Sequence, residues 1–191
     1  WQQELSTLER ATPVGFPDHG RDQKACTKDL KHELALSVEA TQRLQVVVQE
    51  CQVTVNALLQ AAWAYVLSTF SHDSSVVFGT TVSGRPADLP DVNHMVGLFI
   101  NTIPVRVDID VDCSVKQWWQ TLHANHMERD QHSFIGLTEI QQCSVLSHDA
   151  ELFDSLLVVE NYPYDEESIN DEHNILNDEH SHHESTNYAM T

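Results

Sequence analysis

The chain has 191 residues, of which 41% are hydrophobic, so it can bury the core of one large domain or two small ones. Its formal net charge of −19 repels phosphate groups, which argues against nucleic-acid binding and against docking on an anionic membrane leaflet. No run of about 18 apolar residues is present to cross a membrane.

The charge is distributed unevenly along the chain. All ten Lys and Arg residues lie at or before Arg129, whereas residues 130–191 contain 14 Asp and Glu residues. This pattern indicates a solvated acidic segment more than a docking surface.

The four cysteines are far apart and predict neither a metal nor a disulfide framework: Cys26, Cys51, Cys113 and Cys143. Reduced thiols would fit a cytoplasmic protein. The chain starts at Trp1 with no basic leader, so we expect no signal peptide and a piece of a longer protein.

The first third of the chain predicts a helix end, a loop, a strand and two helices. Residues 1–8 have the apolar spacing of a last helical turn, and Pro and Gly residues between 13 and 20 predict a loop. Apolar and charged residues alternate over 29–36, which predicts a strand with one buried face. Ser37 and Thr54 are candidate N-caps of helices that end near residues 50 and 70. The second helix is apolar nearly all round, which predicts burial on several sides.

The rest of the chain predicts alternating strands and helices. Strands starting at Val76 and covering 98–107 are nearly continuous apolar runs, as in central strands that are covered on both faces. A capping box at Ser114 opens a helix to about residue 130, and a short helix follows over 137–142. A buried strand is predicted over 154–160, a mobile acidic loop over 164–184 and the start of a strand over 187–191. This alternation predicts the α/β or α+β class.

Two short segments contain polar residues beside the predicted central strands. Ser83, Gly84 and Arg85 follow the first strand, where Gly permits special backbone conformations and Arg can bind a carboxylate bidentately. Asn101 interrupts the apolar second strand and needs hydrogen-bond partners. It either joins a neighbouring loop to the strand or lines a substrate channel. His123 and His126 share a helix face, but no third ligand has a recognised spacing, so we predict no metal site.

These segments resemble core motifs of the condensation domains of nonribosomal peptide synthetases. The family has a segment similar to Phe-Gly-x-x-x-Ser-Gly-Arg-Pro, followed by one like Val-Gly-x-Phe-x-Asn-Thr-x-Pro-x-Arg. This chain has both, over residues 78–86 and 96–106. Residues 57–64 resemble the helix before the first motif, and residues 152–163 resemble a later strand of the family. His132 resembles the family's His-containing motif, but Ser133, Phe134 and Ile135 follow it instead of a Pro-Phe pair, which leaves its role open.

The resemblance implies a chloramphenicol-acetyltransferase-like fold, with two lobes and an active-site tunnel between them. This chain would be a truncated C-terminal lobe: residues 1–26 would be the end of the helix and loop between the lobes, and residues 27–191 the lobe itself. The family's catalytic motif, His-His-x-x-x-Asp-Gly, does not occur in these residues, so no catalytic residue is assigned. Ser83, Gly84, Arg85 and Asn101 would line the tunnel or orient groups in it, and Arg85 would pair with the Asp of that motif.

The implied reaction joins a donor acyl thioester to an acceptor aminoacyl group through an amide bond. Both substrates would be carried on 4'-phosphopantetheine of peptidyl carrier proteins upstream and downstream, with an adenylation domain in the same parent chain, and this chain would bind no cofactor directly. Three alternatives stay open. A heterocyclisation domain differs mainly in the His motif. An epimerisation domain typically has Gly-Trp-Phe-Thr where this chain has Gly97-Leu98-Phe99-Ile100. The last alternative is a non-catalytic module that binds carrier proteins.

Overall fold

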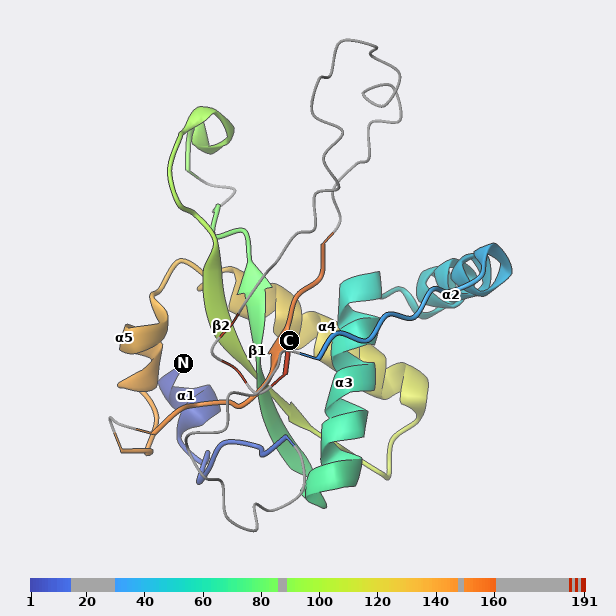
Figure 1. The fold of residues 1–191 in the computed structure, drawn as a ribbon, viewed down its shortest axis with the longest axis horizontal. Helices are drawn as coiled ribbons and strands as arrows, with labels where there is room; N and C mark the ends of the chain where they lie inside the picture. Colours follow the sequence, from blue (N-terminus) through green and yellow to red (C-terminus); the bar gives the residue numbers. More distant parts are fainter. Residues whose placement is uncertain (15–29, 86–88, 148–149, 161–185, 187, 189) are drawn as a thin grey trace.

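The computed structural model describes residues 1–14, 30–85, 89–147, 150–160, 186, 188, 190 and 191. It shows a mixed α/β lobe in which helices surround a small sheet (Figure 1). The described elements, in chain order, are α1 (Gln2–Leu5), α2 (Val38–Cys51), α3 (Val55–Ser71), β1 (Ser75–Val82), η1 (Val92–His94), β2 (Asn101–Asp108), α4 (Val115–Asp130), α5 (Leu137–Gln141) and β3 (Leu156–Leu157). The loops predicted near residues 13–20 and over 164–184 lie wholly or mostly outside the described residues, as does the proposed boundary at residue 26.

The sheet has the strand order β2-β1-β3 within the described residues. β1 and β2 are antiparallel, with Val82 opposite Asn101, and β1 and β3 are parallel, with Gly79 opposite Leu156. An isolated parallel bridge joins Ser155 to Met190, in the stretch where the sequence predicts a last strand. β1 is therefore the central strand, and the antiparallel pair brings residues after β1 next to residues before β2.

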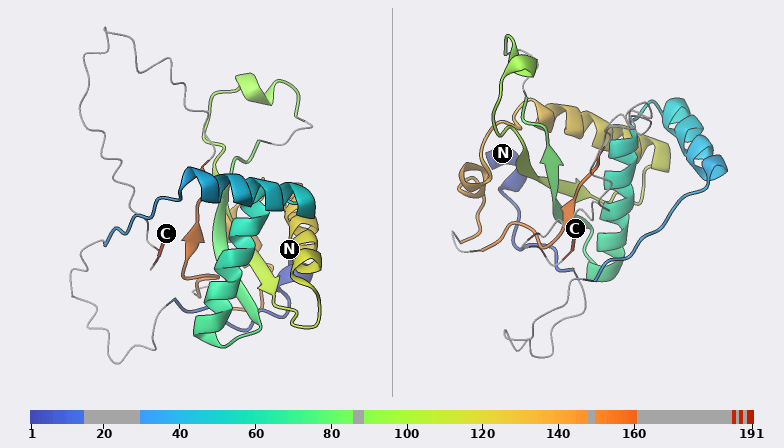
Figure 2. Two further views of the ribbon diagram at one scale, coloured as in Figure 1. Left: turned by 90° about the vertical axis from the view of Figure 1, so that its right-hand side faces the viewer. Right: turned by 45° about the horizontal axis from the view of Figure 1, so that its top comes forward.

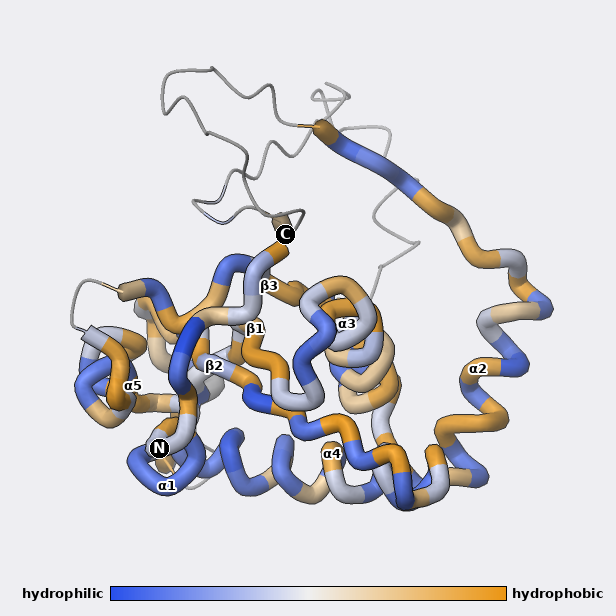
Figure 3. The backbone as a smooth tube through the Cα atoms, turned by 90° about the horizontal axis from the view of Figure 1, so that it is seen from below, coloured by the Kyte–Doolittle hydropathy of each residue, from blue (hydrophilic) through white to orange (hydrophobic). Residues whose placement is uncertain are grey.

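Helices cover both faces of the sheet, as the apolar strands predict. One core contains α3, α4 and one face of the sheet, around Phe78 and Leu122. The other contains α1, α5 and the opposite face, around Val77 and Phe153. Figure 3 shows β1 as a mainly hydrophobic strand between these two helical layers. Burial on both faces explains the unbroken Val76-Val77-Phe78 run, because each residue is at most 1% exposed.

The predicted helix starts are confirmed by their cap hydrogen bonds. The side chains of Ser37 and Thr54 accept hydrogen bonds from the backbone N–H groups three residues later, each at 3.1 Å. Ser114 and Gln117 form the reciprocal bonds of a capping box at the start of α4. These caps satisfy N–H groups that the first helical turn leaves without partners, so local sequence alone sets the helix starts.

The prediction of a strand over 29–36 is wrong, because the described part of this range, residues 30–36, has no regular secondary structure. Leu30 and Leu34 are 95% and 83% exposed. Alternating leucines form a strand only against a neighbouring strand and an apolar layer, and the described residues provide neither at this place. Figure 2 shows this segment leading into α2, which extends away from the sheet.

Other predictions need smaller corrections. β2 begins at Asn101, three residues later than predicted, because Leu98 and Ile100 are exposed and lie outside the sheet. The strand predicted over 154–160 is reduced to the two residues of β3. The burial predicted on several sides of α3 is limited, because Tyr65 and Phe70 are more than 60% exposed and the buried residues of this helix are Ala57, Gln60, Ala61, Ala64 and Leu67. Within the described residues, no single helix is long and apolar enough to cross a membrane, and the bent pair α2–α3 meets that test by length and composition alone.

Candidate functional site

The residues predicted to line a site lie where β1 ends and β2 begins. The backbone at Gly84 approaches that of Phe99 closely, continuing the side-by-side course of the two strands. Gly84 has φ +59°, and a Cβ atom there would lie 1.9 Å from the Phe99 carbonyl oxygen. Only glycine combines this left-handed conformation with such an approach. Ser83 lies beside it and is exposed.

The Arg85 side chain turns back onto the loop of residues 89–100, which we call the 89–100 loop. Its Nη1 donates to the Val92 carbonyl oxygen, and its Nη2 donates to the Met95 carbonyl oxygen at 3.2 Å. Its guanidinium carbon also lies 4.1 Å from the centre of the Phe99 ring, which is a cation–π contact. In Figures 1 and 2 this loop extends beyond the end of the sheet.

Asn101, the first residue of β2, joins the strand to the turn after α4. Its Nδ2 donates to the carbonyl oxygens of Ser133 and Ile135, both at 2.7 Å, and its Oδ1 accepts from the Thr102 N–H at 2.9 Å. These are the contacts expected of an Asn that joins a neighbouring loop to the strand. Asn101 therefore contacts a different segment from the one that Arg85 holds.

Of the three histidines considered in the sequence, His123 and His126 lie one turn apart on α4, and His132 lies in the turn that follows this helix. His132 is exposed, and its carbonyl oxygen accepts a hydrogen bond from Trp1 Nε1 at 3.3 Å. Burial lowers the pKa of His126, and the nearby Arg129 charge lowers it further, whereas the Asp130 carboxylate raises it. Among the described residues there is no group of three or more His, Cys, Asp or Glu side chains arranged to hold a metal ion.

The structure also reveals important residues that sequence reasoning missed. Arg129 is 5% exposed on α4, and its Nη1 lies 3.1 Å from Oε1 of Glu4 in α1. Its Nε and Nη2 are buried without a hydrogen-bond partner in the described part of the chain. No sequence pattern links two residues 125 positions apart. Phe99 lies within the resembling motif, so that motif was the available signal for it.

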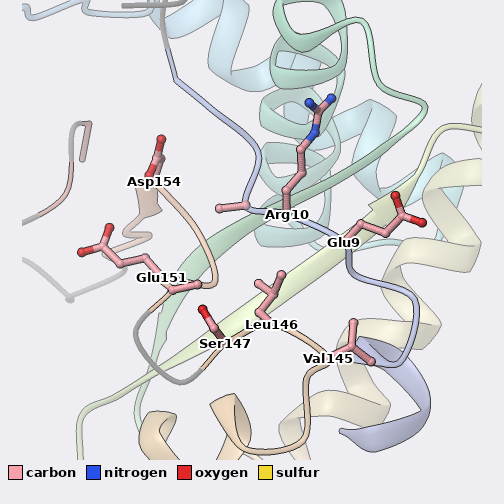
Figure 4. A pocket seen from close by; sticks show the side chains of 9 residues that line it. Glu9, Arg10, Val145, Leu146, Ser147, Glu151 and Asp154 are labelled. Carbon is pink, nitrogen blue, oxygen red and sulfur yellow. The ribbon is translucent and has the colours of Figure 1, made fainter.

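A shallow surface hollow lies on another part of the lobe, between the segment after α1 and the segment after α5. Its lining includes three carboxylates, from Glu9, Glu151 and Asp154 (Figure 4). Arg10 at its edge turns toward α3 and pairs with Asp73, with 2.8 Å between Nη2 and Oδ2. The residues predicted from the motifs do not line this hollow.

Comparison with known proteins explains the paired segments. A sequence model of the Condensation domain family matches residues 1–191. The chain belongs to the condensation domain family. It is 37% identical over 192 residues to a linear gramicidin synthase of Brevibacillus parabrevis, covering 100% of this chain and 2% of that protein. It is 38% identical over 165 residues to chondramide synthase cmdD of Chondromyces crocatus, covering 86% of this chain and 4% of that protein.

The fold agrees with this family. The crystal structure of a four-domain nonribosomal peptide synthetase bound to AMP and glycine matches with a TM-score of 0.56 at 20% identity, over 63% of this chain and 9% of that one. The family model thus confirms the predicted family, and this structural likeness confirms the mixed α/β class. These curated relatives are far longer than the chain, which spans only 2% to 4% of their length.

Proposed function

We propose that this chain is the C-terminal part of a condensation domain that forms an amide bond between two carrier-bound substrates. The observation that carries the proposal is the family match over all 191 residues, in a chain whose relatives are peptide synthetases. In the proposed reaction, the acceptor's neutral amine attacks the donor thioester carbonyl. The new C–N bond replaces the C–S bond, and the thiol of the donor's phosphopantetheine arm leaves with a proton.

The proposed contribution of this chain is to hold and orient the substrates. Positioning two reactants can lower a barrier substantially without any proton transfer from the positioning residues. Gly84, Arg85 and Asn101 support this role, because each fixes backbone at one end of the central strand pair. Ser83 is included in the proposal because it directly follows β1 and precedes Gly84. The partners would be the upstream and downstream carrier proteins and an adenylation domain of the same parent protein, in the cytoplasm.

The test is an assay of the complete condensation domain with loaded donor and acceptor carriers. Mass spectrometry of the acceptor arm should show the amide-linked product, and replacing the His-His-x-x-x-Asp-Gly histidines expected before this chain should abolish it. Loss of a further water would favour heterocyclisation, and inverted Cα configuration without joining would favour epimerisation. Carrier binding without any product would favour a non-catalytic module. The 191-residue chain alone should form no amide bond, and turnover by it would refute this assignment.

A further inference from the structure

Apart from Val92, which is 7% exposed, the 89–100 loop has little side-chain packing of its own to determine its path. Val96 and Leu98 are 103% and 91% exposed, and Met95 and Ile100 are exposed as well. Backbone hydrogen bonds within it are short-range ones, such as His94 N–H to the Asp91 carbonyl oxygen at 2.9 Å. A loop with few buried contacts has low local stability, so another group must select one conformation.

Arg85 provides contacts along most of this loop. Its two Nη atoms bind carbonyl oxygens at Val92 and Met95, and its guanidinium group lies against the ring of Phe99. The three contacts are therefore spread from residue 92 to residue 99. A planar guanidinium can donate in two directions and stack at the same time, whereas a Lys ammonium cannot reproduce this arrangement.

Gly84 completes the arrangement at the end of the loop. Any side chain at position 84 would collide with the Phe99 carbonyl oxygen, so the close approach of these two residues fixes where Phe99 lies. Phe99 is thus held on its backbone side by Gly84 and on its ring by Arg85. Because Arg85 is the next residue after Gly84, one short segment determines the position of both the ring and the loop carbonyls.

We propose that Arg85 and Phe99 form a clamp, closed by Gly84, that sets the conformation of the 89–100 loop, and that Phe99 is a positioning residue for the condensation reaction. The part about the reaction rests on the proposed function. In this account Arg85 acts through the loop. If Arg85 instead acted by pairing with the Asp of the His motif, the Phe99 ring would contribute nothing to that pairing.

The first test measures loop opening without any assay of activity. In the complete condensation domain, native-state cleavage by thermolysin, which cuts before Leu98 and Phe99, reports opening of the loop. Phe99→Leu, which loses the cation–π contact, should raise the cleavage rate about tenfold, and Arg85→Ala, which also loses two charged hydrogen bonds, should raise it at least as much. Phe99→Tyr keeps the ring and should cleave at the wild-type rate. Arg43→Ala, an exposed Arg on α2, is the matched control and should change nothing.

The double variant separates a clamp from two independent contacts. Arg85→Ala combined with Phe99→Leu should be cleaved no more than about twofold faster than Arg85→Ala alone, because the second change removes a ring contact that Arg85→Ala has already removed. Multiplying effects, or a wild-type cleavage rate for Phe99→Leu, would overturn the clamp. Thermal midpoints within about 2 °C of wild type would show that the effect is local.

The second test follows amide formation in the same variants. Phe99→Leu should slow product formation by about tenfold and Arg85→Ala by at least as much, whereas Phe99→Tyr, which keeps the ring, should form product at the wild-type rate. An unchanged rate for Phe99→Leu beside a slowed Arg85→Ala would overturn the positioning role and favour the ion pair. If the wild-type domain makes no product, the proposed function fails and with it the positioning role, while the cleavage experiment still decides whether the clamp exists.

Discussion

Gly79 is a buried residue of the central strand β1, and one added methyl group there should be strongly destabilising. A Cβ atom there would lie 2.3 Å from Cε2 and 2.7 Å from Cζ of Phe153. Ordinary contact begins near 3.4 Å, so the ring would have to move by about 1.1 Å. Phe153 is 1% exposed in the core between the sheet and helices α1 and α5, so that movement disturbs its neighbours. We expect Gly79→Ala to lower the free energy of unfolding by about 1–3 kcal/mol.

The assay is urea denaturation of the complete condensation domain followed by circular dichroism, at constant m-value. Gly136→Ala is the matched control, because no described atom other than those of its two chain neighbours lies within 4 Å of its added Cβ. We expect it to change stability by no more than about 0.5 kcal/mol. Phe153→Leu should partly relieve the collision. The double variant, Gly79→Ala with Phe153→Leu, should therefore be about 1 kcal/mol more stable than the sum of the two single losses predicts. A loss below about 0.5 kcal/mol for Gly79→Ala, or strict additivity, would refute the reasoning.

Three further predictions follow from the polar contacts. Asn101→Ala removes two 2.7 Å hydrogen bonds and should lower the free energy of unfolding by about 2 kcal/mol in the same denaturation assay. Amide exchange in the turn at 133–135 should become faster, and unchanged exchange would contradict this prediction. Glu4→Gln leaves the buried Arg129 charge without its partner and should lower the free energy of unfolding by about 3 kcal/mol. Glu9→Gln, at an exposed position, should change it by almost nothing, and equal effects of the two variants would count against the buried pair. Burial lowers the pKa of His126 below its ordinary 6.5, so as the pH falls the unfolded chain takes up this proton before the folded chain does. The free energy of unfolding should therefore fall as the pH drops below about 6.5. His126→Gln should show a smaller fall, and an identical pH profile would contradict the assignment.

The sequence predicted the helix starts and the family because both depend on short stretches of residues. Each cap hydrogen bond spans three residues, so Ser37, Thr54 and Ser114 identify helix N-termini without any knowledge of the fold. The apolar run at the start of β1 likewise predicted a strand buried on both faces, which the two cores confirm. The paired segments around Arg85 and Asn101 were sufficient to indicate the condensation domain family.

Tertiary structure alone decided which residues meet across the chain. The bond from Asn101 to Ser133 spans 32 positions, and the pair of Glu4 and Arg129 spans 125. The local pattern cannot show whether a segment with alternating leucines has a neighbouring strand. Residues 30–36 have this pattern, yet they are exposed and have no neighbouring strand among the described residues. Arg85 is the clearest case, because its sequence context indicated a bidentate donor, while the fold placed two loop carbonyls and the Phe99 ring within its reach. Sequence specifies the chemical capacity of such a side chain, whereas its partners depend on how the whole chain packs.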